Sequence, residues 1–237
     1  MAGTAGKAGT ALIVGVGSGL SASLARLCAK QGMAVCLAAR DSGKLGALAD
    51  AVGARAYACD AAIPAQVDRL FDEVVRASGA PDLVVYNASY RWRGPVAEAP
   101  PEEALKALMI SCYGGFLVGR AAARAMQPRG SGSIFFTGAS ASVKGFAQSA
   151  TFAMGKFGLR GLAQSMAREL APKNIHVAHF VIDGGILNPA KGRAEDTPGA
   201  DALLHPDSIA ETYWNIHTQH RSAWTWEIEL RPWVEKF

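Results

Sequence analysis

Three glycines near the start of the chain have the spacing of a phosphate-binding turn. Gly15, Gly17 and Gly19 alternate directly after an apolar run, and an amphipathic pattern begins at Leu20. This order predicts a strand, a tight turn and a helix. Glycine lets the backbone approach a ligand closely, and the N–H groups at a helix start attract phosphate, so we expect a nucleotide pyrophosphate here. A turn that merely joins a strand to a helix would look the same.

A lysine in the second half of the chain has the surroundings of a ligand-binding residue. Lys156 interrupts a run of small and apolar residues that extends from Phe152 to Leu159. Burying an ammonium group without a partner is costly. The pattern therefore favours a lysine directed toward a ligand over the solvated lysine that is usual on helices.

Polar residues follow three of the predicted strands at the points where the strands end. They are Arg40 after the strand 34–38, Asp60 with Ala61 after 54–59, and Asn87, Ala88 and Ser89 after 82–86. In open parallel sheets, ligands bind at the carboxyl ends of the strands, so these residues can meet one ligand. Asp60 is equally suited to a cap or turn before Pro64, and asparagine is routine in turns.

The end of the second strand also indicates which dinucleotide is preferred. An acidic residue about 20 positions past the glycines bonds the adenosine ribose, whereas a nearby arginine accommodates a 2′-phosphate. Ala39 occupies that place and Arg40 follows it. The sequence therefore favours NADP(H), and the neighbouring Asp41 keeps NAD(H) open as the alternative.

The order of the elements predicts an α/β fold. Apolar strands at 11–14, 34–38, 54–59, 82–86, 133–137 and 175–182 alternate with amphipathic helices, among them 44–51, 102–126 and 151–170, and a helix at 206–218 and a strand at 226–230 follow. Buried strands joined by helical crossovers form a parallel sheet covered on both faces, which with the glycine turn gives a doubly wound, three-layer αβα Rossmann fold. We expect a flexible segment 1–10, one domain over 11–237, and a binding loop at about 184–205.

Composition excludes several functional classes. The 237 residues carry a formal charge of +4, but the basic residues are scattered, so we expect no nucleic-acid partner. No segment has the length and apolarity of a signal peptide or a bilayer span, so we expect a cytoplasmic protein that does not contact a membrane. The four cysteines have no metal-ligand spacing and lie in apolar segments, which is typical of a reducing compartment; they are Cys28, Cys36, Cys59 and Cys112.

The histidines do not suggest a metal site, and the aromatic residues of the tail suggest a subunit contact. His176 and His179 lie three apart on a predicted strand, so they face opposite sides and cannot share a metal ion. We expect His217 and His220 at the surface. The aromatics of the tail favour burial against another subunit; they are Tyr213, Trp214, Trp224, Trp226 and Trp233.

Together these motifs resemble the short-chain dehydrogenase/reductase family over nearly the whole chain. The three glycines match its T-G-x-x-x-G-x-G turn, with Val14 for the threonine and Ser21 for the last glycine, and Lys156 matches the lysine of Y-x-x-x-K. Residues 87–89 resemble N-A-G, and 183–186 resemble the P-G turn. The resemblance implies these cofactor-binding residues: Gly15, Gly17, Ser18, Gly19, Leu20, Arg40, Asp60, Ala61, Asn87, Ala88, Ser89, Lys156, Gly184 and Ile186.

The catalytic pattern of that family is broken here. Phe152 stands at the tyrosine position, Ala139 at the serine position and Ser111 at the asparagine position, and no shift of register restores Y-x-x-x-K. A phenyl ring has no proton to exchange. Only Lys156 keeps its residue type, and we take Ser140 as the first candidate for a replacement hydroxyl; Ser142, Tyr90, Tyr113 and a water molecule are the others.

Two functions remain open. The resemblance implies an NADP(H)-dependent oxidoreductase that acts on an unknown small carbonyl or alcohol with a non-standard proton donor. The alternative is a nucleotide-binding relative with little or no turnover, such as a sensor or a partner subunit, and redox-neutral chemistry on the same scaffold is a third. The loop with Tyr90, Arg91, Trp92 and Arg93 suits either an anionic or aromatic substrate or a subunit contact. A homodimer or homotetramer is expected.

Overall fold

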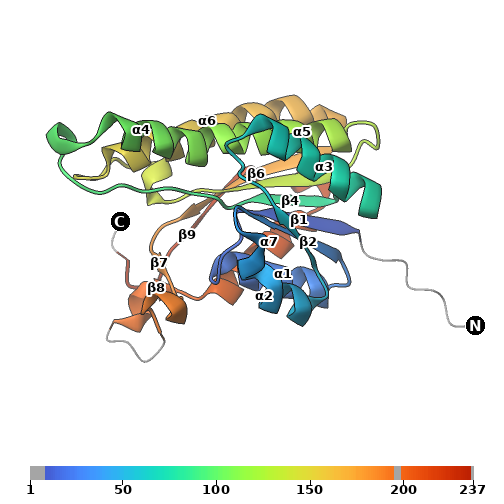
Figure 1. Cartoon of the computed structure of the whole chain (residues 1–237), viewed down its shortest axis with the longest axis horizontal. Helices are drawn as coiled ribbons and strands as arrows, with labels where there is room; N and C mark the ends of the chain where they lie inside the picture. Colours follow the sequence, from blue (N-terminus) through green and yellow to red (C-terminus); the bar gives the residue numbers. More distant parts are fainter. Residues whose placement is uncertain (1–8, 195–198, 236–237) are drawn as a thin grey trace, which may run out of the picture.

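A parallel sheet forms the middle of the molecule in this computed structural model, which describes residues 9–194 and 199–235 (Figure 1). The seven strands run in the order β3-β2-β1-β4-β5-β6-β9, and every pair is parallel. They are β1 (Thr10–Val14), β2 (Ala34–Ala39), β3 (Arg55–Ala58), β4 (Leu83–Tyr86), β5 (Gly132–Thr137), β6 (Ile175–Ile182) and β9 (Glu227–Leu230). The strand order reverses between β1 and β4, which is where such sheets bind ligands.

Helices cover both faces of the sheet (Figure 1). One face carries α1 (Leu20–Lys30), α2 (Gly46–Val52) and α7 (Pro206–His217), and the other carries α3 (Pro64–Ser78), α4 (Pro101–Leu108), α5 (Gly114–Met126) and α6 (Ala150–Leu170). The predicted doubly wound, three-layer αβα fold is confirmed.

The central strands are buried because helices pack on both sides of them. Within β1, Leu12 belongs to the apolar core under α3, α5 and α6, and Ile13 belongs to the core under α1 and α7. Both side chains are fully buried. This two-sided burial explains why the strands are near-continuous apolar runs rather than alternating ones.

Several predicted boundaries shift in the structure. β1 begins at Thr10, whose N–H donates to Asp82, and residues 1–8 of the predicted N-terminal segment lie outside the described residues. The predicted helix 44–51 is a 3₁₀ turn at Ser42–Leu45 followed by α2. β3 is shorter than predicted and largely exposed, because it is the edge strand of the sheet.

The predicted helix 102–126 is interrupted by a π turn at Met109–Tyr113. We predicted that Leu105, Leu108, Met109, Cys112 and Phe116 would face inward, and this was wrong for Leu105 and Phe116, which are 60% and 42% exposed. Small residues form the buried face instead, because α6 approaches closely. A Cβ added at Gly155 of α6 would lie only 2.9 Å from the Ser111 Cβ atom.

The tail and its histidines were partly mispredicted. His217 is half-buried rather than on the surface, since its Nδ1 lies 2.9 Å from the Ser133 hydroxyl; His220 is exposed as expected. Tyr213 is fully buried in the core of its own chain, and Trp224 stacks on His176 at 4.6 Å. These tail aromatics fold back onto the sheet, and Trp233, 82% exposed, is the one that stands out.

The predicted loop at 184–205 contains some regular structure. Two short parallel strands pair within it, β7 (Gly185–Ile186) and β8 (Leu203–Leu204), and a 3₁₀ turn spans Pro189–Lys191. Positions 195–198 of the loop lie outside the described residues. Among residues 9–194 and 199–235, no helix has the length and apolarity needed to cross a membrane.

Candidate functional site

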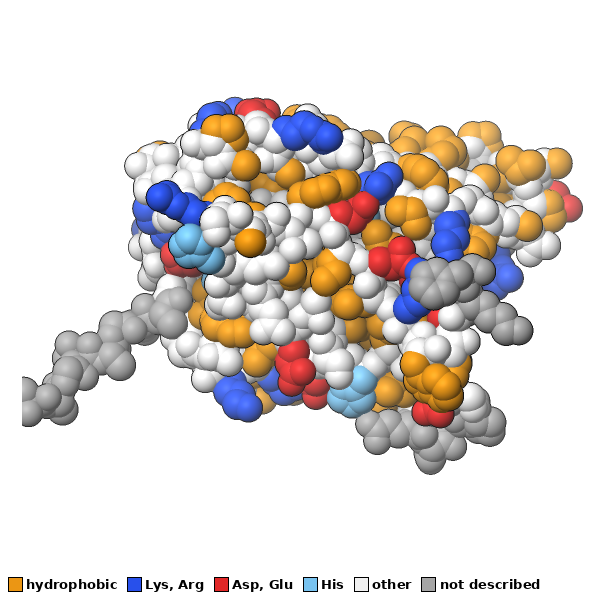
Figure 2. Space-filling model, turned by 180° about the vertical axis from the view of Figure 1, so that it is seen from behind, with side chains coloured by type: hydrophobic (Ala, Val, Ile, Leu, Met, Phe, Trp, Pro, Cys, Tyr) orange, Lys and Arg blue, Asp and Glu red, His pale blue; other side chains and the backbone are white. Residues whose placement is uncertain are grey.

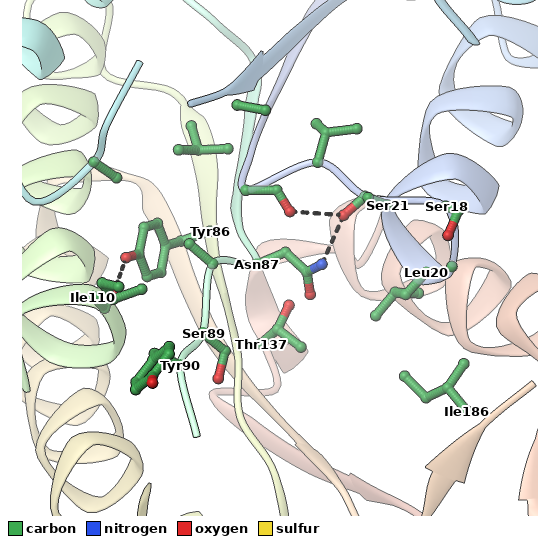
Figure 3. Close-up of a pocket in the computed structure, with 18 of the residues that line it drawn as sticks. Ser18, Leu20, Ser21, Tyr86, Asn87, Ser89, Tyr90, Ile110, Thr137 and Ile186 are labelled. Carbon is green, nitrogen blue, oxygen red and sulfur yellow. Dashed lines mark hydrogen bonds between the residues drawn. The ribbon is translucent and has the colours of Figure 1, made fainter. Parts of the chain in front are cut away.

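A cavity of about 670 Å³ opens at the carboxyl ends of the strands. Every residue that we predicted to bind a cofactor lines it; these are Gly15, Gly17, Ser18, Gly19, Leu20, Arg40, Asp60, Ala61, Asn87, Ala88, Ser89, Lys156, Gly184 and Ile186. Figure 3 shows part of this lining, with Ser18, Leu20, Asn87, Ser89 and Ile186 among the labelled residues. The segments that contribute them are far apart in the sequence. The parallel sheet brings them together because its strand ends all lie on one edge.

The glycine turn is shaped by close packing on one side and open space on the other. Gly15 has a φ of +85°, and a Cβ added to it would lie 2.3 Å from the Ala88 amide nitrogen. A Cβ added to Gly17 would meet no atom of the described chain within 4 Å. Gly15 thus permits the turn, and Gly17 leaves room for a ligand against the backbone.

A pair of hydrogen bonds ties the glycine turn to the end of β4 (Figure 3). The Asn87 amide donates to the Ser21 hydroxyl over 2.6 Å, and the Ser21 hydroxyl donates to the Gly15 carbonyl over 3.3 Å. The first turn of α1 carries no acidic residue, and no side chain caps its N-terminus. Its free N–H groups therefore make the electropositive helix start that suits a phosphate.

At the end of β2, a basic side chain is free while the acidic one is engaged. The Asp41 carboxylate accepts from the Gly43 N–H over 3.1 Å and pairs with Lys44 at 3.3 Å. Arg40 lines the cavity and has no hydrogen bond or ion pair within the described chain. Asp60 has both of the positions that the sequence left open: its carboxylate accepts from the Ala62 N–H over 3.0 Å in a turn, and the residue also lines the cavity.

Lys156 is buried in the wall of the cavity. Its side chain is 2% exposed, and its ammonium donates to the Thr137 carbonyl oxygen over 2.8 Å. Burial lowers its pKa from 10.5 to about 8, because the charged form is desolvated. The prediction that this lysine points at a ligand site rather than at bulk solvent is consistent with its place in the cavity wall.

The positions of the missing catalytic groups surround this lysine. Phe152 and Ala139 line the cavity, and the Lys156 ammonium lies 5.9 Å from the centre of the Phe152 ring. Ser111 is fully buried in the π turn, where its hydroxyl accepts from the Tyr90 N–H over 3.2 Å. Ser111 therefore supports the 90–93 loop and does not line the cavity.

Three of the four candidate replacement hydroxyls are engaged elsewhere, and the fourth residue, Tyr113, does not line the cavity. Ser140 does not line the cavity, and its hydroxyl forms a hydrogen bond with Asp183. Burial alone would raise the Asp183 pKa, but the hydrogen bonds from Ser140 and Lys144 and the charge of Arg231 hold this pKa below its usual range. Ser142 is buried and accepts from the Ala139 N–H. Tyr90 lines the cavity, but its hydroxyl donates to the Glu103 carboxylate. The geometry therefore does not favour Ser140 as the proton donor.

Among the cavity residues that sequence reasoning did not assign, three lie in the predicted loop at 184–205. Asn188, Lys191 and Arg193 line the cavity from the segment after β7, and the Asn188 amide shares a hydrogen bond with the Ser18 hydroxyl over 3.2 Å. Their signal was the predicted loop at 184–205, whose individual residues have no motif. Only the chain reversal after β6 brings them opposite the glycine turn.

A second polar cluster lies under α6, outside the cavity wall. His179 is fully buried, and its Nδ1 lies 3.0 Å from a Glu227 carboxylate that Arg160 holds through two hydrogen bonds of 2.6 and 2.8 Å. Burial, which outweighs Glu227, lowers the His179 pKa to about 4, so the ring is neutral at ordinary pH. His176 lies on the other face of β6 against Trp224, so the two rings face opposite sides as predicted.

The cysteines behave as predicted from their apolar surroundings. Cys28, Cys36 and Cys59 are buried, and all four are free thiols. Burial raises the pKa of Cys28 to about 12 and that of Cys59 to about 11, so these thiols are not reactive at ordinary pH. The described residues hold no group of three or more side chains able to bind a metal ion.

Comparisons with known proteins agree with this geometry. Residues 15–215 match the family model described as enoyl-(acyl carrier protein) reductase. Trans-4-hydroxycyclohexanecarboxylate dehydrogenase from Sinomonas cyclohexanicum is 33% identical over 76% of this chain and 73% of its own. A short-chain dehydrogenase from Rhodopseudomonas palustris is 35% identical, with a TM-score of 0.79 over 94% and 99% of the two chains. A metagenomic short-chain oxidoreductase in complex with NADP is 26% identical, with a TM-score of 0.81 over 95% and 98%.

Proposed function

The chain belongs to the short-chain dehydrogenase/reductase family, so it is an NAD(P)-dependent oxidoreductase of that family, and we propose that it uses NADP(H) to interconvert a small carbonyl compound and its alcohol with a non-standard proton donor. The single observation that carries the proposal is the cavity that joins the glycine turn to the buried Lys156.

The residues of the cavity fit such a coenzyme. The open space at Gly17 and the uncapped start of α1 suit the pyrophosphate, and Lys156 lines the same cavity, where it would hold the nicotinamide ribose. Arg40, free of any acidic partner in the described chain, would meet a 2′-phosphate. The coenzyme supplies the hydride.

The chain's own residues must then supply a proton and a polar environment. We assign the proton to the Lys156 ammonium, which would donate it to the oxygen of a carbonyl undergoing reduction. Support comes from the engagement of the nearby hydroxyls of Ser142 and Tyr90 and from the lowered pKa of Lys156, which makes its proton easier to release.

A fluorescence titration with NADPH and NADH tests the coenzyme preference. We expect tighter binding of NADPH, and we expect Arg40→Gln to weaken NADPH binding by about tenfold and leave NADH unchanged, since one charge-assisted contact to the phosphate is lost. Arg76→Gln, in the last turn of α3 and away from the cavity, is the matched control. Tighter binding of NADH by the wild type would refute the role of Arg40.

Turnover distinguishes the oxidoreductase from a weak or inactive nucleotide-binding relative. We expect slow reduction of generic ketones by the wild type, and Phe152→Tyr to raise the rate, since a positioned acid is worth about 10²–10⁴ in rate. Phe152→Leu is the control for a change of packing. Coenzyme binding with no turnover on any ketone would favour the inactive alternative. Wild-type turnover at the usual rates of dehydrogenases, lost in Phe152→Tyr, would mean that another residue serves as the proton donor of this site.

We also propose that the chain forms a homodimer or homotetramer. Large apolar side chains are exposed on α4, α5, α6 and the segment before α6; they are Leu105, Phe116, Phe146, Met154 and Phe157. Figure 2 shows hydrophobic side chains gathered at the end of the molecule where α4 lies. Exposed apolar patches of this kind are typical of subunit contacts. A cytoplasmic location stays a prediction.

A further inference from the structure

Phe152, which stands at the position of the family's tyrosine, forms a cation–π contact with an arginine. The guanidinium carbon of Arg91 lies 5.2 Å from the centre of the Phe152 ring, and Phe152 lines the cavity near Lys156. A cation over an aromatic face is attracted by the ring quadrupole. This contact places an arginine head group beside the cavity, although Arg91 is exposed and belongs to the loop after β4 rather than to the cavity wall.

Arg91 is held in place at several points. Its Nη2 donates to the hydroxyl of Ser149, which is 2% exposed and precedes α6. The loop on either side is fastened to the same segment, because the Gly94 N–H donates to the Gln148 carbonyl over 3.0 Å. The Thr151 hydroxyl donates to the Trp92 carbonyl over 3.4 Å. The guanidinium is therefore oriented before any ligand arrives.

The charge of Arg91 is not balanced by a carboxylate. Its guanidinium makes no other hydrogen bond and no ion pair within residues 9–194 and 199–235, so most of its five N–H donors are free. Three other cations are paired with carboxylates: Lys106 with Glu103 at 3.8 Å, Lys144 with Asp183 at 3.2 Å, and Arg160 with Glu227 at 2.6 Å. Arg91 alone among these four presents an open, oriented fork.

We propose that Arg91 binds an anionic group of the substrate, so that the protein selects small carbonyl compounds that carry a carboxylate beside the reacting carbonyl. A guanidinium fork matches a carboxylate with two parallel hydrogen bonds. Because Arg91 and Lys156 lie 5.2 and 5.9 Å from the centre of the same Phe152 ring, a carboxylate bound by Arg91 would lie near Lys156. The inference rests on the proposed function, because it assumes that the reacting carbonyl lies beside Lys156.

Binding to the NADP⁺-loaded protein tests this without turnover. Isothermal titration would compare three 2-oxo acids, pyruvate, 2-oxopentanoate and phenylglyoxylate, with their methyl esters. We expect at least one acid to bind about tenfold tighter than its ester or more, since a single charge-assisted hydrogen bond already contributes about that much and the fork can form two. We also expect the preference to weaken as salt is raised. Arg91→Gln removes the preference by weakening the acid alone, and Arg91→Lys keeps only part of it because the fork is lost.

Arg93→Gln is the matched control, since this arginine lies on the same loop and is exposed like Arg91, but within the described residues it has neither the cation–π contact with Phe152 nor the hydrogen bond to Ser149. It should keep the wild-type preference. Equal weakening of acid and ester in Arg91→Gln, or the absence of any acid preference in the coenzyme-bound wild type, overturns the proposal. Coenzyme binding is measured first: if NADP⁺ does not bind, the proposed function fails, whereas bound NADP⁺ with no acid preference refutes the anion site alone.

Discussion

Replacing Lys156 with methionine should stabilise the protein at neutral pH while removing its activity. The ammonium is 2% exposed and has a pKa of about 8 in the folded chain, against 10.5 for an ordinary lysine. At about pH 7 both states are protonated, and the shift corresponds to a penalty of about 3 kcal/mol for burying the charge. Methionine removes this penalty, but it leaves the Thr137 carbonyl without its hydrogen bond, which costs about 1 kcal/mol. We expect a net gain of about 2 kcal/mol for Lys156→Met.

The pH dependence gives the sharper test. Between the folded and unfolded pKa values, the unfolded chain binds a proton that the folded chain has released, so the stability of the wild type rises with pH. From about pH 7 to about pH 9.5, the wild type should gain about 2 kcal/mol relative to Lys156→Met, and the difference between them should nearly vanish. Other titrating groups, such as the cysteines, are common to both proteins and cancel in the comparison.

The assay is urea unfolding of coenzyme-free protein, followed by circular dichroism at both pH values. A free-energy difference that does not change with pH, or a wild type that is the more stable protein at neutral pH, would refute the view that a charged amine is buried here. Lys30→Met, at the exposed end of α1, is the control and should show little dependence on pH. Coenzyme binding should oppose the effect, since anionic phosphate and ribose hydroxyls favour the protonated amine.

Three further outcomes are expected. Gly15→Ala should lower the melting temperature measured by calorimetry, because its Cβ would lie 2.3 Å from the Ala88 nitrogen at a φ of +85°. Gly17→Ala should melt like the wild type, but it should bind NADPH more weakly in a fluorescence titration. Because the His179 pKa falls from 6.5 to about 4 on folding, the free energy of unfolding of the wild type should decrease as pH drops through this interval. His179→Asn should show a shallower decrease in an acid titration, and equal slopes in the two proteins would contradict this prediction. Phe146→Asp with Phe157→Asp should reduce the assembly state measured by light scattering, while Ile63→Asp, exposed just before α3, should not. A wild type that is monomeric at all concentrations would refute the proposed assembly.

The sequence by itself determined the architecture and the positions of the residues that we propose bind the coenzyme. Apolar strands that alternate with amphipathic helices have few ways to bury both faces, and the doubly wound sheet is the one that places every strand end on a common edge. Gly15 and Gly17, Asn87 and Lys156 could therefore be assigned to one cavity from local pattern alone, because each immediately follows a strand or interrupts an apolar helix face.

The tertiary structure decided everything that depends on side chains meeting across the fold. Ser111 is buried in the π turn where α6 packs closely through Gly155, and the periodicity of a single helix does not contain this contact. The Ser140 hydroxyl is engaged with Asp183, and the position of Arg91 over Phe152 depends on a hydrogen bond to Ser149, which lies 58 residues away in the sequence. Strand ends are fixed by local sequence, whereas the direction of a loop side chain is fixed by the partner that folding brings to it.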